Sequence, residues 1–279
     1  MTGSGKIAVL MSVYSGDKPD QVEKALRSIL EQTYQNFILF VGCDGPLSNE
    51  LSETVRGFDD DRLEVIRYPE NRGLARTLNS LIDLALADRK VDFLARMDAD
   101  DVSLEQRFEQ QVQYLGSHPA VSVLGTGCLE IIGDGDVVFD KRLPQFHSTL
   151  FRQFVKQCPV VHPTVMFRRN VFDAGIRYPV EFFRTEDLAL WMRLMREGYE
   201  FANIQQPLLL FRIGDNFVKR RADRKKGWAE FKIRLEAIKQ LDLPILANAF
   251  YALAHLGVKI SPAFLVGLAY RLARSEKAN

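Results

Sequence analysis

The sequence predicts an α/β fold in which a mostly parallel β-sheet is covered by helices on both faces. Four short runs rich in Val, Ile, Leu and Phe have the continuous apolar character of strands that are buried on both sides. Between them lie segments with apolar residues at helical spacing, and strands that alternate with such helices are typical of parallel sheets. The strand runs are residues 7–14, 37–42, 63–67 and 91–96, and the clearest helices are residues 19–32 and 74–86.

Length and composition fit a folded protein. The chain has 279 residues, of which 47% are hydrophobic and 26% charged, and these values allow one large domain or two small ones and exclude a disordered chain. The three cysteines, Cys43, Cys128 and Cys158, are odd in number and lack CxxC spacing. The sequence therefore predicts neither a disulfide framework nor a zinc site.

The predicted elements follow in order along the chain. The helix over residues 19–32 has a proline in its first turn and an apolar face that includes Val22, Leu26 and Ile29. After residue 120 the regular alternation loosens. The elements expected there are a strand over residues 121–125, a hairpin at residues 133–135, and helices near residues 145–157 and 187–197.

Charge divides the chain into two parts. Residues 1–218 hold 24 basic and 31 acidic side chains, a net charge of −7, whereas the remaining 61 residues carry +8. A nucleic-acid-binding protein is expected to be basic over its binding domain, so the acidic majority of the chain argues against that class. We therefore expect a folded domain over residues 1–218 and a basic, apolar tail over residues 219–279.

The tail allows two interpretations. Residues 219–239 contain nine basic and three acidic residues and predict a basic helix. The apolar stretches that follow, residues 243–258 and 260–270, are each shorter than the roughly 20 residues of a membrane-spanning helix. Such a tail suits in-plane binding to anionic lipid, or packing on the domain or on another subunit. The apolar run over residues 7–13 is too short for the core of a signal peptide, so we expect a cytosol-facing protein.

The fourth strand run ends in three carboxylates within four residues, Asp98, Asp100 and Asp101. Carboxylates this close repel one another unless a cation or positive groups neutralise them, and oxygen ligands suit Mg²⁺ or Mn²⁺. The alternative is that Asp101 or Ser103 caps a helix that starts near Leu104, but capping accounts for only one of the three. The sequence therefore predicts a divalent metal site.

Two further polar segments lie near predicted strand ends and helix starts. Asp44 directly follows the second strand run and precedes Gly45 and Pro46. A carboxylate there is placed to bind a base or a ribose, or to stabilise its own turn. Arg72 and Arg76 lie at a predicted helix entry, within reach of a phosphate group.

Thr185, Glu186 and Asp187 precede a helical apolar stripe and therefore lie at the start of a helix. Helix capping and the helix dipole account for Thr185 and Glu186. A carboxylate at the rim of a pocket is also suited to deprotonate a hydroxyl as a general base. Both interpretations stay open.

Taken together and in order, these segments resemble glycosyltransferase family 2 over residues 5–215. The likeness is greatest to bacterial members that build exopolysaccharide and lipopolysaccharide chains. It rests on five segments in order: residues 9–14, 43–45, 71–79, the Arg-Met-Asp-Ala-Asp-Asp run at residues 96–101, and residues 185–187, which open the Glu-Asp-Leu-Ala-Leu-Trp run at residues 186–191. The resemblance implies a GT-A fold, a nucleotide-diphosphate sugar donor, a divalent metal, and inversion at the anomeric carbon by direct displacement.

The resemblance also implies roles for individual residues on the donor side. The nucleobase pocket would be lined by Ser12, Val13 and Tyr14, and Asp44 would form a hydrogen bond with the uracil or another base.

The remaining implied roles concern the metal and the acceptor. Asp98 would lie near the ribose and the metal, and Asp100 would coordinate the metal. Asp187 would be the general base with Glu186 beside it, and His162 would lie on the acceptor side.

The chain departs from the family pattern at two places. Leu78 stands where the family often has an arginine, so the base or phosphate contact is expected to pass to Arg76. Residues 213–216 lack the metal-ligating histidine that is common in that region. Arg212 and Arg220 are expected to contact the diphosphate or, alternatively, to belong to a solvated basic face.

We therefore expect a metal-dependent inverting glycosyltransferase that moves a sugar from a UDP-sugar or another nucleotide-diphosphate donor to a saccharide acceptor, expected to be lipid-linked. Residues 1–120 would bind the donor and residues 121–218 the acceptor, while the tail would dock at the inner face of the plasma membrane. No nucleic acid is expected as a partner. The alternatives are a metal-dependent nucleotidyltransferase or hydrolase on a similar sheet, and a nucleic-acid-binding module on residues 219–239.

Overall fold

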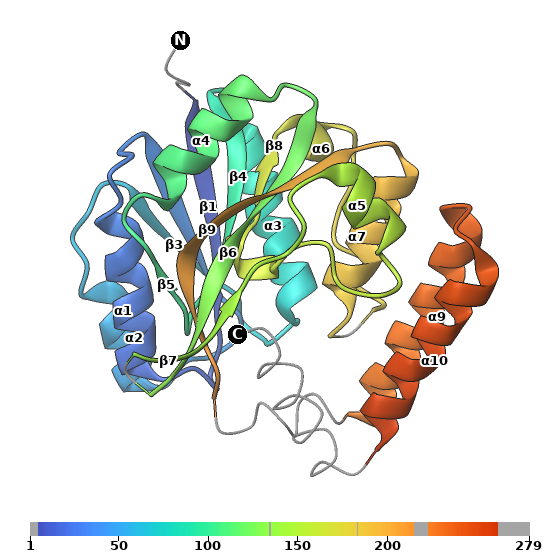
Figure 1. Cartoon of the computed structure of the whole chain (residues 1–279). Coiled ribbons are helices and arrows are strands. Elements are labelled where there is room, and N and C mark those ends of the chain that lie inside the picture. Colours follow the sequence, from blue (N-terminus) through green and yellow to red (C-terminus); the bar gives the residue numbers. More distant parts are fainter. Residues whose placement is uncertain (1–4, 134, 183, 215–222, 262–279) are drawn as a thin grey trace.

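The computed structural model describes residues 5–133, 135–182, 184–214 and 223–261, and its centre is a twisted sheet with helices on both faces (Figure 1). The strands are β1 (Lys6–Val13), β2 (Phe37–Cys43), β3 (Leu63–Arg67), β4 (Val91–Asp98), β5 (Val102–Ser103), β6 (Val121–Ile132), β7 (Asp136–Lys141), β8 (Met166–Arg168) and β9 (Glu200–Arg212). The α-helices are α1 (Pro19–Leu30), α2 (Asn49–Arg56), α3 (Leu74–Ala87), α4 (Arg107–Ser117), α5 (His147–Arg152), α6 (Asn170–Asp173), α7 (Glu186–Arg196), α9 (Arg224–Gln240) and α10 (Ile245–Ile260).

The order of strands places a switch point in the sheet between β1 and β4. The order is β3-β2-β1-β4-β8-β6-β9-β5, with β7 paired to β6. β1 is parallel to both β2 and β4, so the chain winds from β1 outward to β3 and then returns to the other side of β1. At such a reversal the connections leave in opposite directions, and a crevice opens at the carboxyl ends of the two strands.

The side chains of β1 show why both faces of the sheet are buried. Ile7, Val9 and Met11 pack into one core together with α1, α2 and α4. Ala8 and Leu10 pack into the other core with α3 and α7. Because successive side chains of a strand point to opposite faces, a strand covered on both sides needs the continuous apolar run that the sequence has here.

The parallel half of the sheet agrees with the prediction, and the later half departs from it. The predicted strands over residues 7–14, 37–42, 63–67 and 91–96 are confirmed as β1 to β4. β6 and β7 pair antiparallel on either side of the predicted hairpin turn, of which residue 134 lies outside the described residues. The predicted helix near residues 145–157 is confined to α5. The sequence did not reveal β9, because Pro207 and two glutamines interrupt its apolar pattern. A shift in the β6–β9 register accommodates this proline.

The helices of the predicted tail form a hairpin at the edge of the molecule beside α7 (Figure 1). The start of α9 lies next to the end of α10, where Lys259 pairs with Glu230 at 3.1 Å. Ile233 and Ala237 of α9 are fully buried in the same core as α7, and Arg234 donates to backbone carbonyls near the end of α5. Within the described ranges, no helix is both long and apolar enough to cross a bilayer. The rest of the tail, residues 219–222 and 262–279, lies outside them.

Candidate active site

The carboxyl ends of β1, β2 and β4 bring the predicted donor-site residues to one edge of the sheet. Ser12 in β1 pairs across the sheet with Gly42 of β2 and with Asp98 of β4. The carbonyl oxygen of Val13 accepts a hydrogen bond from the backbone N–H of Asp44 at 2.7 Å. Since β1 and β4 flank the switch point, the loop after β1 and the aspartates after β4 border the same crevice.

The loop after β1 contributes a carboxylate that sequence reasoning missed. Tyr14 is 47% exposed, and its backbone N–H donates to the carboxylate of Asp17 at 2.9 Å. Burial raises the pKa of Asp17 to about 7, and the negative charges of Asp100 and Asp98 add to this effect. Asp17 is therefore a fourth acid beside the aspartates of β4, brought there by the fold from a distant part of the chain.

Asp44 is buried and fastens the end of β2 to the start of α3. The backbone N–H of Arg72 donates to its Oδ1 at 2.8 Å, and that of Gly73 donates to its Oδ2 at 2.9 Å. Gly73 has a φ of 86°, a conformation that favours glycine. The carboxylate therefore does more than stabilise a turn at Gly45, because it connects the end of β2 to the start of α3.

The two arginines near the start of α3 have different surroundings. The guanidinium of Arg72 lies over the ring of Tyr68, 3.7 Å from its centroid, and donates to Ser80. Arg76 is exposed one turn further on. Leu78, at the position where the family often has an arginine, is fully buried in the core. Arg76 is thus the arginine that this helix presents to solvent.

The three aspartates after β4 form a group with the chemistry of a divalent metal site. Asp98, Asp100 and Asp101 each place a carboxylate oxygen within 4.8 Å of the others. Burial, followed by the charges of Asp100 and Asp98, raises the pKa of Asp101. Oδ2 of Asp101 is buried and has no hydrogen-bond partner among the described residues. Hard oxygen ligands with one unpartnered buried oxygen fit Mg²⁺ or Mn²⁺.

Two buried arginines to which the sequence assigned no role bring positive charge to this group of aspartates. Arg96 is 2% exposed and forms an ion pair with Asp98. Arg107 is fully buried and donates to the carbonyl oxygens of Pro163 and Arg96, both at 3.0 Å. Burial lowers the pKa of Arg107 to about 9, while the charge of Asp101 opposes this shift.

The alternative in which Asp101 or Ser103 caps a helix near Leu104 is wrong. The helix in question is α4, which begins at Arg107 with Gln106 in the capping position. Ser103 lies in β5: its backbone N–H donates to the hydroxyl of Ser28 in α1, and its hydroxyl accepts from the side-chain amide of Gln32. The aspartates are therefore not explained by helix capping.

Arg212 lies at the end of β9 and ties this strand to the aspartate loop. Its backbone N–H donates to Oδ1 of Asp101 at 2.8 Å, and its Nε donates to the carbonyl oxygen of Asp100 at 3.0 Å. Its Nη1 donates to the carbonyl oxygen of Gly133. Arg212 is thus beside the aspartates, with these guanidinium bonds directed to the backbone. Arg220, its predicted companion, lies outside the described residues.

The second group of acids forms the first turn of α7. Glu186 is 8% exposed and Asp187 is half-buried. Burial raises the pKa of Asp187, while the charge of Lys226 from α9 lowers it, and burial together with the charge of Asp187 raises the pKa of Glu186. The hydroxyl of Thr185 does not cap the helix: it is buried without a hydrogen-bond partner in the described part of the chain. A carboxylate with a raised pKa is suited to general-base chemistry.

His162 and Tyr178 form a buried polar pair in the acceptor half. Nε2 of His162 and the hydroxyl of Tyr178 are 2.8 Å apart, and the ring of His162 meets Trp191 edge-on. Burial lowers the pKa of His162 well below its ordinary value, so this histidine is neutral. Asn79 of α3 holds the Tyr178 backbone with two hydrogen bonds of 2.8 Å.

Tyr178 also lies within electrostatic reach of both groups of acids. Burial raises its pKa, the charge of Arg96 opposes this, and the charges of Asp187, Glu186 and Asp98 add to it. The charges of Asp98 and of the two acids of α7 thus act on the same tyrosine, although about 90 residues of sequence separate them. No sequence motif pointed to Tyr178.

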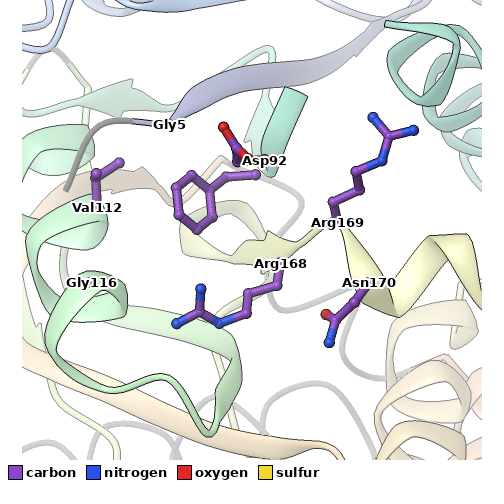
Figure 2. A pocket seen from close by; sticks show the side chains of 8 residues that line it. Gly5, Asp92, Val112, Gly116, Arg168, Arg169 and Asn170 are labelled. Atoms are coloured by element: carbon purple, nitrogen blue, oxygen red, sulfur yellow. The ribbon is translucent and has the colours of Figure 1, made fainter. Parts of the chain in front are cut away.

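The pocket in Figure 2 lies at the opposite edge of the sheet. It has a volume of about 420 Å³, and Gly5 and Asp92, at the amino ends of β1 and β4, belong to its lining. The guanidinium groups of Arg168 and Arg169 point to backbone carbonyls, with bonds of 2.7 Å to Val121 and 2.6 Å to the carbonyl of residue 88. This pocket is separate from the crevice with the aspartates.

Two solved structures show that the fold of this chain is the GT-A fold. Staphylococcus aureus TarS in complex with UDP-GlcNAc superposes with a TM-score of 0.67 at 16% identity, over 90% of this chain and 71% of that one. The mannosyltransferase PcManGT from Pyrobaculum calidifontis, in complex with GDP-Man and Mn²⁺, gives a TM-score of 0.62 at 18% identity, over 96% of this chain and 79% of that one. The predicted GT-A fold is thus confirmed.

The chain belongs to glycosyltransferase family 2, as its motifs predicted. The profile described as "Glycosyl transferase family 2" matches residues 8–176. The amylovoran biosynthesis glycosyltransferase AmsE of Erwinia amylovora is 30% identical over 87% of this chain and 88% of its own length. The Escherichia coli UDP-Gal:alpha-D-GlcNAc-diphosphoundecaprenol beta-1,3-galactosyltransferase is 28% identical over 81% of each. These relatives place the protein among the glycosyltransferases of bacterial polysaccharide biosynthesis.

Proposed function

We propose that this protein is an inverting glycosyltransferase that moves a sugar from a nucleotide-diphosphate donor, a UDP-sugar, to a saccharide acceptor carried on a lipid. The observation that carries the proposal is the presence of two separate groups of acids, the aspartates at residues 98–101 and the acids that begin α7, whose charges both act on Tyr178. The UDP-GlcNAc in the TarS structure and the diphosphoundecaprenol-linked substrate in the name of the E. coli relative support the donor and acceptor classes.

On the donor side, the loop after β1 receives the nucleobase. Ser12, Val13 and the exposed ring of Tyr14 line the base pocket, and Asp44 holds its wall while keeping a lone pair for the base. Arg76 and Arg212 would bring positive charge to the diphosphate. Arg220 stays a predicted contact of the diphosphate that lies outside the described residues.

On the metal side, Asp98 and Asp100 would hold Mn²⁺ or Mg²⁺, and Asp101 is close enough to them to offer a further oxygen. When bound, the cation neutralises the negative charge that develops on the departing diphosphate. A divalent cation is proposed here because a positive ion relieves the mutual repulsion of these closely spaced aspartates.

On the acceptor side, Asp187 takes the proton from the acceptor hydroxyl. The hydroxyl oxygen forms its bond to the anomeric carbon while the bond from that carbon to the diphosphate oxygen breaks, and the electron pair leaves with the nucleoside diphosphate. Attack opposite to the leaving group inverts the anomeric centre. Glu186 is a second carboxyl beside the proposed base. His162 belongs to the acceptor side.

We extend the proposal to domains and location. Residues 1–120 bind the donor, residues 121–218 the acceptor, and residues 219–279 serve as an attachment segment for work at the inner face of the plasma membrane. A nucleotidyltransferase or a hydrolase would need the aspartates alone, with a phosphate or a water as the attacking group. The acids of α7 and the family match favour glycosyl transfer.

The first experiment is calorimetric titration of the protein with UDP, GDP and CDP, each with Mn²⁺ and again with EDTA. We expect tight binding of UDP only when Mn²⁺ is present. Binding of another nucleotide would change the donor class, and failure of all three to bind folded protein would contradict the proposal. Release of sugar from the donor without any acceptor, at the rate seen with acceptor, would favour a hydrolase.

A further inference from the structure

α10 presents an apolar face that no described part of the chain covers. More than half of the surface of each residue on this face is exposed: 71% for Ile245, 90% for Leu246, 68% for Phe250 and 58% for Leu253. The opposite face of the helix is the one that packs inward: Asn248, Ala252 and Leu256 are at most 7% exposed.

This face carries no charged side chain. Lys259 is the one Lys, Arg, Asp or Glu within Ile245–Ile260, and it pairs with Glu230 of α9 at 3.1 Å. Contiguous exposed apolar side chains over three helical turns are uncommon on a protein that contacts only water. The exposed apolar face of α10 therefore indicates an apolar binding partner.

The other helix of the hairpin presents positive charge. Its exposed basic side chains outnumber its one exposed acid, Glu236, and Trp228 is 51% exposed among them. The two remaining acids of this segment are already paired, Asp223 with Arg184 and Glu230 with Lys259. The exposed basic residues of α9 are Arg224, Lys225, Lys232 and Lys239.

We propose that the α9–α10 hairpin docks in the plane of an anionic lipid bilayer. Leu246, Phe250 and Leu253 insert among the upper parts of the acyl chains, and Lys232 and Lys239 contact the headgroups. The combination of an exposed apolar face with exposed positive charge on the helix packed beside it is the one that interfacial helices use, and α10 has too few residues to span a bilayer.

A second copy of this chain fits the surface less well. A two-fold contact through α10 would apply the same patch twice and bring the basic α9 helices of both copies toward each other. The positive charge next to the apolar face would then oppose association, whereas anionic lipid is attracted by it.

The hairpin is fixed to the acceptor side of the proposed active site. Asp223 at the start of α9 pairs with Arg184 in the loop before α7 at 3.2 Å, and the charge of Lys226 acts on Asp187. Docking of the hairpin would therefore hold the proposed base close to the bilayer, where a lipid-linked hydroxyl arrives. This role rests on the proposed function, whereas the docking surface itself does not.

The test compares two double variants of the full-length protein by sedimentation with vesicles of phosphatidylglycerol and phosphatidylethanolamine. Leu246→Glu with Phe250→Glu changes the proposed face. Leu84→Glu with Val137→Glu adds the same charge at positions that are 38% and 54% exposed elsewhere. We expect the first pair to weaken vesicle binding at least about tenfold and the control pair to have little effect. Lys232→Gln should weaken binding by roughly fivefold at low salt.

Three results would overturn the docking surface. One is that the wild type binds no vesicles, and another is that both double variants bind them equally well. The third is that light scattering shows a dimer which only Leu246→Glu with Phe250→Glu dissociates, since a second copy would then cover the face. Titration with UDP and Mn²⁺ in every variant reports on the fold and on the proposed function separately: wild type that binds vesicles but not UDP would contradict the function alone.

Discussion

The two groups of acids in this protein obtain their positive partners in different ways. Asp98 pairs with Arg96, two residues away in the same strand, so the aspartates of β4 and much of their compensation belong to one short segment. Asp187 is compensated by Lys226, which comes from a helix that the chain reaches only after β9. The charge compensation of Asp98 is therefore local, whereas that of Asp187 depends on packing of the hairpin. Changes on the first side should act on metal and donor, and changes on the second on turnover and its pH dependence.

The largest effect is expected for Asp100→Ala. This variant removes an oxygen ligand from a half-buried position outside the cores, so transfer should fall by about a thousandfold while the protein stays folded. Calorimetry should show that the variant also loses the binding of UDP in the presence of Mn²⁺. Asp59→Ala, an exposed acid elsewhere, is the matched control. Full activity of Asp100→Ala in the presence of Mn²⁺ would refute the metal role.

Asp187→Asn tests the acceptor side. We expect turnover to fall by about a hundredfold or more because the general base is lost, with UDP affinity unchanged. Wild-type activity should decline as the pH falls through the raised pKa of Asp187, since only the carboxylate accepts the proton, and the variant should lose this acidic limb. Loss of donor affinity in Asp187→Asn would show instead that the residue serves the metal or the fold.

Asp17→Asn probes the fourth acid of the donor side through stability. A carboxyl whose pKa is raised from 3.8 to about 7 favours folding in its protonated form, so this group destabilises the metal-free protein progressively as the pH rises from about 4 to about 7. At pH 8 the variant should be more stable than wild type by on the order of 1 to 3 kcal/mol, and at pH 4 the two should be equal. Chemical denaturation in EDTA measures the difference, with Asp61→Asn as the control. Equal stability at both pH values would show that Asp17 does not face the aspartates as described.

The smallest effect is expected for Lys226→Gln. Because the Lys226 ammonium lowers the pKa of Asp187, its removal should move the acidic limb of the pH–rate profile upward by less than about one unit. Lys225→Gln removes the same charge from the exposed neighbouring position and should leave the limb where it is. An identical shift in both variants would mean that the overall positive charge of α9, and not Lys226 in particular, sets the pKa of Asp187.

The parts of the fold that were predictable have a short-range signature. The strands β1 to β4 are continuous apolar runs, and Asp44 and Asp98 stand where those runs stop, so their place at one edge of the sheet follows from parallel pairing. β9 was not predictable, because a proline and two glutamines hide a strand whose register with β6 shifts to accommodate them. Tyr178 carries no motif and is recognised only from the acids around it.

The sequence by itself determined the α/β class, the parallel half of the sheet and the family, because apolar runs and the carboxylates that end them are properties of neighbouring residues. Only the tertiary structure decided which groups these carboxylates meet. Asp44 binds backbone N–H groups 28 and 29 residues away, and Asp101 accepts one from a residue 111 positions away. The tertiary structure alone also showed that α9 packs inward while α10 keeps an apolar face outward. Contacts between distant segments depend on how whole elements pack, and such packing leaves no periodic pattern in the chain.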